Sequence, residues 1–200
     1  MPIKYKNEVF MRSINVYHGS LASGIEKFKP TSHFGSRIQG FCSIVTHAAL
    51  DRGKGVPTIY DCNIVCKESE VFHIKDWGSP KPQAALYWYC SEIGRYEQFR
   101  DEYFQKAMKE GLEPYSGKWI EWLILEANLS GHKLLSYENK VEGKGLSYCV
   151  IDDNIVRIVK SEEVSFSQIK RALESAGRKY FGFDDSDWGE IQRYLAENSC

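Results

Sequence analysis

The segment INVYHGS, from Ile14 to Ser20, alternates apolar and polar residues until it reaches a glycine. An alternation of this kind is typical of a β-strand with one buried face, and the glycine indicates that the strand runs into a loop. His18 is therefore expected near the end of a strand. The residues that follow, SGIEKFKPTSHFGS, are rich in Gly, Pro and Ser and predict a loop.

Beyond this loop the pattern predicts a helix from Ser36 to Gly53, weakened by Gly40 and ended by Gly53. Strand composition returns in PTIYDCNIVC and EVFHIKD, and again in HKLLSYEN and LSYCVIDDNIVRIVK. Between these pairs, from about residue 83 to 129, apolar residues recur at spacings of three and four, which predicts amphipathic helices. Examples of this spacing are Phe99 with Tyr103, and Trp119 with Trp122 and Leu123.

Two more helices are predicted near the end of the sequence, SFSQIKRALESAG and DSDWGEIQRYLAEN. Ser165 and Gln168 have the spacing of a capping box at the start of the first. The whole pattern predicts one α+β domain over residues 1–200. It would have a split, mostly antiparallel sheet, a helical insertion at about 80–130 and a helical tail at about 161–200.

Composition narrows the classes of partner. Lys and Arg number 26 against 27 for Asp and Glu, so there is no basic field of the kind that attracts nucleic acid. No apolar run is long enough for a membrane span, and the start lacks the apolar core of a secretory signal, so we expect no membrane partner and a cytoplasmic location. We find no phosphate loop, Rossmann glycine motif, H-E-x-x-H or G-x-S-x-G in the sequence.

The six cysteines lack C-x-x-C spacing and indicate no metal site. Cys62 and Cys66 lie four residues apart in a β-branched segment, so both side chains would point to one face of a strand. Reduced thiols in the core are the expectation, because free cysteine is readily buried.

Three segments carry a resemblance to a known family: VYHGS (16–20), SHFGS with the following helix that contains AALDR (32–52), and YENKVEGKGLSYCVIDDNIVRI (137–158). In this order they resemble the NAD-binding core of ADP-ribosyltransferases of the diphtheria-toxin and poly(ADP-ribose) polymerase type, especially small bacterial and phage-encoded members. The span IYDCNIVCKESEVFHIKDWG is similar to a strand pair of such proteins. The resemblance implies the split sheet of that family, NAD as substrate and no metal.

The implied activity is mono-ADP-ribosyl transfer from NAD to a macromolecular acceptor with release of nicotinamide. Members of the superfamily act as effectors and toxins, so the resemblance also implies delivery from a bacterium into a target cell without a classical signal peptide. The near-neutral charge favours a protein or small-molecule acceptor over nucleic acid.

The first motif implies part of the NAD site. His18 would bond the adenosine-side ribose, Gly19 would contact the nicotinamide amide through its backbone, and Ser20 would have a supporting role beside Tyr17. A glycine suits such contact because ligand and backbone can approach closely. The alternative for His18 is a hydrogen-bonded histidine at a strand end with no ligand.

In the second motif of the family an aromatic residue packs on nicotinamide and a Ser or Thr follows. Phe34 and Ser36 are the nearest match here, with His33 and Gly35 adjacent to them. Phe34 has core packing as its alternative, since aromatic residues are commonly buried.

The third motif departs from the family. Cleavage of the nicotinamide–ribose bond forms an oxocarbenium-like sugar, which a nearby carboxylate stabilises. The family places that glutamate directly before a tyrosine, but here Ser147 precedes Tyr148. Glu142 is therefore the first candidate for the carboxylate and Glu138 the second, each with a solvated loop acid as its alternative.

Three other functions remain open on the sequence. NAD glycohydrolysis would cleave the same bond with water as the acceptor. The chain could instead be a catalytically inactive module that binds NAD or ADP-ribose, which is the alternative that Ser147 raises. A structural or inhibitory partner protein, with a coincidental VYHGS, is the third.

Overall fold

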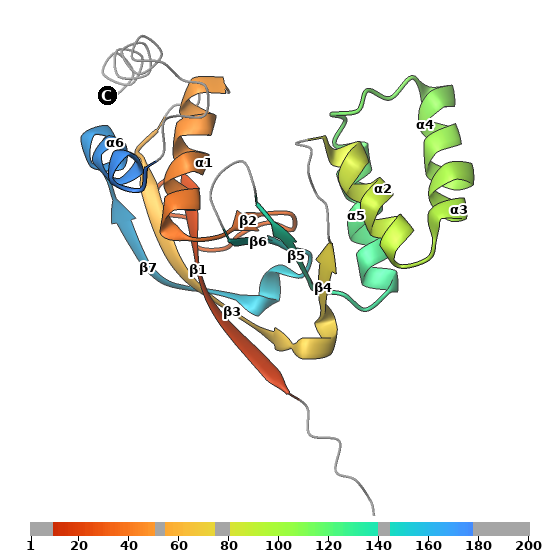
Figure 1. The fold of residues 1–200 in the computed structure, drawn as a ribbon, viewed down its shortest axis with the longest axis horizontal. Helices are drawn as coiled ribbons and strands as arrows, with labels where there is room; N and C mark the ends of the chain where they lie inside the picture. The colour runs from red at the N-terminus through yellow and green to blue at the C-terminus, as the bar shows by residue number, and fades with distance from the viewer. Residues whose placement is uncertain (1–9, 51–54, 75–80, 140–144, 178–200) are drawn as a thin grey trace, which may run out of the picture.

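The computed structural model describes residues 10–50, 55–74, 81–139 and 145–177, which form two β-sheets and a set of helices (Figure 1). The first sheet has the order β1 (Met11–Ser20), β3 (Thr58–Lys67), β7 (Val156–Glu163), and both of its pairings are antiparallel. This architecture confirms the predicted α+β class.

The second sheet has the order β2, β6, β5, β4. Only β4 and β5 pair in parallel, and the other two pairings are antiparallel. Three of its strands lie within segments that were predicted to be strands, but the short β2 lies within the segment that was predicted to be a loop. The bounds are β2 (His33–Phe34), β4 (Val71–Ile74), β5 (Leu134–Glu138) and β6 (Leu146–Val150).

Helices α1 (Arg37–Leu50) and α6 (Phe166–Ser175) lie together on one end of the first sheet (Figure 1). Both helices were predicted. Ser165 caps α6 by accepting a hydrogen bond from the Gln168 amide, and the side chain of Gln168 accepts from the Ser165 amide, so the predicted capping box is confirmed. The second tail helix that the sequence predicts, at 185–198, lies outside the described residues.

The opposite face of the first sheet packs on the second sheet. Alternate residues of β3 point into this layer, and Cys62 and Cys66 share it, as their spacing predicts. The five cysteines within the described residues are buried and form no disulfide with one another, which agrees with the prediction of reduced core thiols for them. Burial raises the pKa of the Cys62 and Cys149 thiols to about 12, so both are protonated at neutral pH.

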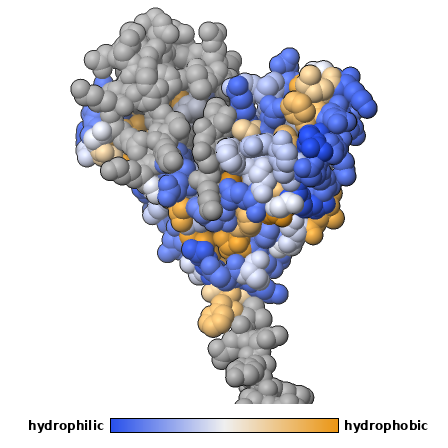
Figure 2. Space-filling model, turned by 45° about the vertical axis from the view of Figure 1, so that its right-hand side comes forward, coloured by the Kyte–Doolittle hydropathy of each residue, from blue (hydrophilic) through white to orange (hydrophobic). Residues whose placement is uncertain are grey.

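The predicted helical insertion forms a lobe beyond β4, on the far side of the second sheet from α1 and α6 (Figure 1). The face of the lobe seen in Figure 2 is mostly hydrophilic, whereas its inner residues make an aromatic core. Among the residues that predicted the helices, Trp119 is fully buried, and Tyr103 is 6% exposed. The lobe comprises α2 (Pro82–Glu92), α3 (Tyr96–Gln98), a π-helical segment (Phe99–Phe104), α4 (Gln105–Glu110) and α5 (Lys118–Leu129).

A buried carboxylate joins the helices of this lobe. Glu126 of α5 is fully buried, and its Oε2 lies 2.7 Å from Nη1 of Arg95. Its Oε1 accepts hydrogen bonds from the hydroxyl of Tyr103 and, at 3.2 Å, from the amide of Gln98. A buried carboxylate needs such partners because desolvation of an unpaired charge is costly.

Within the described ranges, none of the helices has the length and apolar character of a membrane span.

Candidate functional site

The three segments that carry the family resemblance meet where β1, β2 and β6 lie side by side. Tyr17 and Gly35 exchange backbone hydrogen bonds of 2.8 and 3.0 Å, which joins β1 to the end of β2. On its other edge β2 pairs with β6, with Phe34 opposite Tyr148. Segments that are far apart in the sequence therefore contribute to one region of the molecule.

His18 fills the place where β1 and β2 diverge. Its Nδ1 lies 2.8 Å from the backbone oxygen of His33. A carbonyl oxygen can only accept, so the hydrogen of the neutral His18 ring is on Nδ1 and the lone pair is on Nε2. The ring packs edge-on against Phe28, with centroids 4.7 Å apart, and burial lowers the pKa of His18. The neutral ring is thus the favoured form.

The second motif places its two rings on opposite faces of the second sheet, because successive residues of a strand alternate. Phe34 is 2% exposed and packs in the layer between the sheets, against His18 and Phe28. In this arrangement no face of its ring is open to a ligand. His33 is exposed, so it is the aromatic side chain of this motif that a ligand can reach.

His33 is tied to β5 by a contact that the sequence did not predict. Its Nδ1 lies 2.9 Å from the hydroxyl of Tyr137, and the two rings meet edge to face. Although His33 is exposed, protein atoms crowd its ring, and their desolvation, together with the nearby His18, lowers the pKa of His33 to about 4. The ring is therefore neutral at physiological pH.

The third motif continues the same face of the second sheet, where Tyr137, Asn139 and Ser147 are buried beside the exposed His33. Ser147 is opposite Tyr137 in the β5–β6 ladder, so the two side chains share a face, and Ser147 accepts a 2.9 Å hydrogen bond from the amide of Asn139. We call His33, Tyr137, Asn139 and Ser147 the polar face. Tyr148 is 8% exposed and packs in the layer between the sheets.

The two candidate carboxylates differ in what the structure says of them. Glu138 is exposed at the end of β5. Because it follows Tyr137, its side chain starts from the other face of the strand, away from the polar face. Glu142, the first candidate, lies outside the described residues.

Ser36 has a structural function that explains its position. It caps α1, since its Oγ accepts from the backbone amide of Gln39 at 3.3 Å and the Oε1 of Gln39 accepts from the Ser36 amide at 2.6 Å. A Cβ on Gly35 would lie 2.0 Å from that Oε1, so a larger residue there would displace the Gln39 side chain from the cap. The Ser-x-x-Gln spacing was present in the sequence, although it was not used to predict the start of this helix.

The other residues of the first motif also have structural neighbours. The side chain of Tyr17 is on the opposite face of β1 from His18, and the guanidinium of Arg37 lies over its ring, 5.9 Å from the centroid. Ser20 accepts a 3.0 Å hydrogen bond from the amide of Ala22. The space left by the absent side chain of Gly19 is filled by α1, not by an opening for a ligand.

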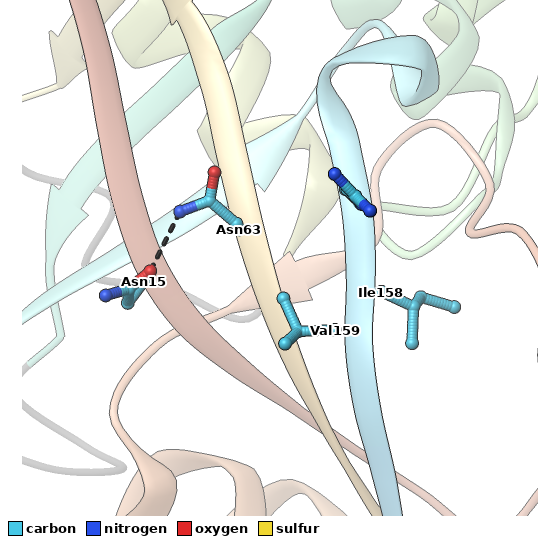
Figure 3. Close-up of a pocket in the computed structure, with 5 residues that line it drawn as sticks. Asn15, Asn63, Ile158 and Val159 are labelled. Carbon is cyan, nitrogen blue, oxygen red and sulfur yellow. Dashed lines mark hydrogen bonds between the residues drawn. The ribbon is translucent and has the colours of Figure 1, made fainter.

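A separate hollow of about 430 Å³ lies on the uncovered end of the outer face of the first sheet (Figure 3). Asn15 and Asn63 point toward one another across it, joined by a hydrogen bond of 2.8 Å from Nδ2 of Asn63 to Oδ1 of Asn15. Arg157, Ile158 and Val159 complete its lining. None of the residues predicted for the NAD site belongs to this hollow.

In the part of the chain that the structure describes, His, Cys, Asp and Glu form no cluster of three or more that could hold a metal ion. Comparison with known proteins found no match to this chain among family models, curated proteins or solved structures.

Proposed function

We propose that this chain is a mono-ADP-ribosyltransferase that binds NAD at the polar face and transfers ADP-ribose to a macromolecular acceptor, with protein favoured. The observation that supports it is the meeting of the three motif segments, seen in the Tyr17–Gly35 bridge, the His18–His33 hydrogen bond and the Phe34–Tyr148 pair. A coincidental resemblance gives no reason for the three motifs to be neighbours in space.

In this reaction the bond between nicotinamide nitrogen and ribose C1′ breaks, and nicotinamide leaves with the bonding electrons. A nucleophilic atom of the acceptor then bonds to C1′ and loses its proton. The oxocarbenium-like sugar between these events needs a negative charge nearby. We assign that charge to Glu142 first, and Glu138 stays the second candidate because its side chain starts from the face of β5 away from the polar face. The neutral groups of the polar face would orient NAD, since hydroxyl, amide and imidazole groups offer both donors and acceptors.

In the test, purified protein is incubated with labelled NAD and bacterial or eukaryotic lysate. Nicotinamide release and labelled macromolecules are both measured. Glu142→Gln and Glu138→Gln are the matched variants, because each removes one charge at nearly constant size. Label transfer lost in one variant and kept in the other supports the proposal and assigns the carboxylate. Nicotinamide release without label would replace it with NAD glycohydrolysis.

One observation favours a second candidate, an inactive module that binds NAD or ADP-ribose. Ser147 stands where the family has its glutamate, and it is 3% exposed and bonded to Asn139. NAD binding without nicotinamide release in any lysate would support this candidate. No NAD binding at millimolar concentration would exclude both proposals, because a dissociation constant of about 1 mM corresponds to a binding free energy of only about −4 kcal/mol.

A further inference from the structure

Tyr137 joins a buried core of the molecule to the exposed ring of His33. Its own ring is 8% exposed and belongs to the core that the second sheet shares with the helical lobe. His33, in contrast, is exposed and lies on a strand of only two residues. The 2.9 Å contact between the Tyr137 hydroxyl and Nδ1 of His33 therefore gives an exposed ring a buried partner.

We propose that Tyr137 is a positioning residue of the ligand site: its hydroxyl donates to Nδ1 of His33, fixes the orientation of that ring and places the ring hydrogen on Nε2. This inference rests on the proposed NAD site and adds a residue to it. The neutral state of His33 supports it, because a neutral imidazole has one nitrogen that accepts and one that donates.

His33 also fixes the ring of His18, through its backbone carbonyl. The His33 carbonyl accepts from Nδ1 of His18, which leaves Nε2 of His18 as an acceptor. The Tyr137 contact gives His33 the opposite polarity, with Nε2 as a donor. With its hydrogen on Nε2, the exposed His33 ring can donate to a ligand rich in hydroxyl groups, such as the riboses of NAD, because a hydroxyl accepts as well as donates.

Tyr137→Phe removes only the hydroxyl, and Ser136→Ala is its matched control. Ser136 is the preceding residue of β5 and its hydroxyl lies 3.2 Å from Nδ1 of His73, on the other face of the sheet. Both changes thus remove a hydroxyl that contacts a histidine ring, but only one touches the polar face. Nitrogen NMR of the full chain reports the tautomer of His33, titration with NAD reports binding, and thermal unfolding reports stability.

In the wild type we expect the His33 hydrogen on Nε2. In Tyr137→Phe we expect a mixture of tautomers and NAD binding weaker by about three- to tenfold, which is the range of one hydrogen bond. Ser136→Ala should leave both readouts at wild-type values. A role in packing alone would shift the unfolding temperature without changing the tautomer.

Three results would overturn the inference. They are a wild-type ring with its hydrogen on Nδ1, a Tyr137→Phe ring with the wild-type tautomer, and equal NAD affinity in the two proteins. The first is read from the wild type alone, so it applies even where the variant does not fold. Failure of the wild type to bind NAD at all would instead overturn the proposed function, and it is recognised without any variant.

Discussion

Gly19 of β1 and Gly40 of α1 are in direct backbone contact. A Cβ added to Gly19 would lie 1.8 Å from the carbonyl oxygen of Gly40, far inside any possible contact. The helix can therefore sit directly on the strand that carries His18, one residue before Gly19. Since the same helix is capped by Ser36, this contact sets the distance between the first and second motifs.

Gly19→Ala should consequently destabilise the protein by about 3 kcal/mol or more, because the obstructing atom belongs to a helix backbone and cannot rotate away. Gly117→Ala is the control, since Gly117 has φ −59° and no atom within 4 Å of a Cβ. It should change the free energy of unfolding by less than about 1 kcal/mol. Chemical denaturation of the two variants measures both values. Equal stabilities would show that β1 and α1 are not in contact.

Ser36→Ala should cost about 1 kcal/mol, the usual value of a helix N-cap. Ser36→Asp should keep most of that stability, because a carboxylate also caps a helix and favours its N-terminus. Ser165→Ala is the matched variant at the same kind of capping box on α6, and we expect a similar loss. Thermal unfolding of the three variants tests the assignment. An unchanged Ser36→Ala protein would remove the cap as the explanation for this serine.

Local patterns predicted most of the fold. Strand alternation in INVYHGS and the spacing of Trp119 and Trp122 arise from residues a few positions apart, and β1 and α5 match them. Strand β2 escaped prediction because its two residues are held by distant partners, such as Tyr148 opposite Phe34. No sequence window contains such a pairing.

The candidate site was predictable to a smaller degree for the same reason. The three motifs lie on strands that the structure brings together, but the faces that their side chains occupy depend on register, which placed Phe34 in the core and left His33 exposed. Tyr137 begins the third motif segment, but its contact with His33 could not be predicted, because the two residues are 104 positions apart in the sequence. The prediction of Glu142 and Glu138 as the carboxylates stays a prediction.

The free energy of unfolding should decrease as the pH falls from 7 to 4, and His33 should contribute to this decrease. Its folded pKa of about 4 lies below the ordinary value of 6.5, so between these values the unfolded state binds more protons than the folded state. The contribution is fully present above about pH 6.5 and is lost as the pH falls toward 4. His33→Gln should reduce the loss between pH 7 and 4 by about 1 kcal/mol, a value discounted because the ring is exposed.

Denaturation of both proteins across this range isolates the histidine, since the carboxylates that titrate near pH 4 are common to both. A second variant, His73→Gln, serves as the control because it removes a histidine that lies away from the polar face. Parallel stability curves for wild type and His33→Gln would mean that the ring has its ordinary pKa.

Glu126→Ala should destabilise the helical lobe by about 2–4 kcal/mol. The change removes the acceptor for Tyr103 and Gln98 and leaves a cavity, while the guanidinium of Arg95, 37% exposed, can turn to water and soften the loss. Glu121→Ala on the same helix breaks only an exposed pair with Lys118 and should cost less than about 1 kcal/mol. Urea denaturation compares the two variants. Because Tyr137 packs in the same core, the Glu126→Ala variant should also loosen the Tyr137–His33 contact. Equal losses of stability in Glu126→Ala and Glu121→Ala would contradict a structural role for the buried carboxylate.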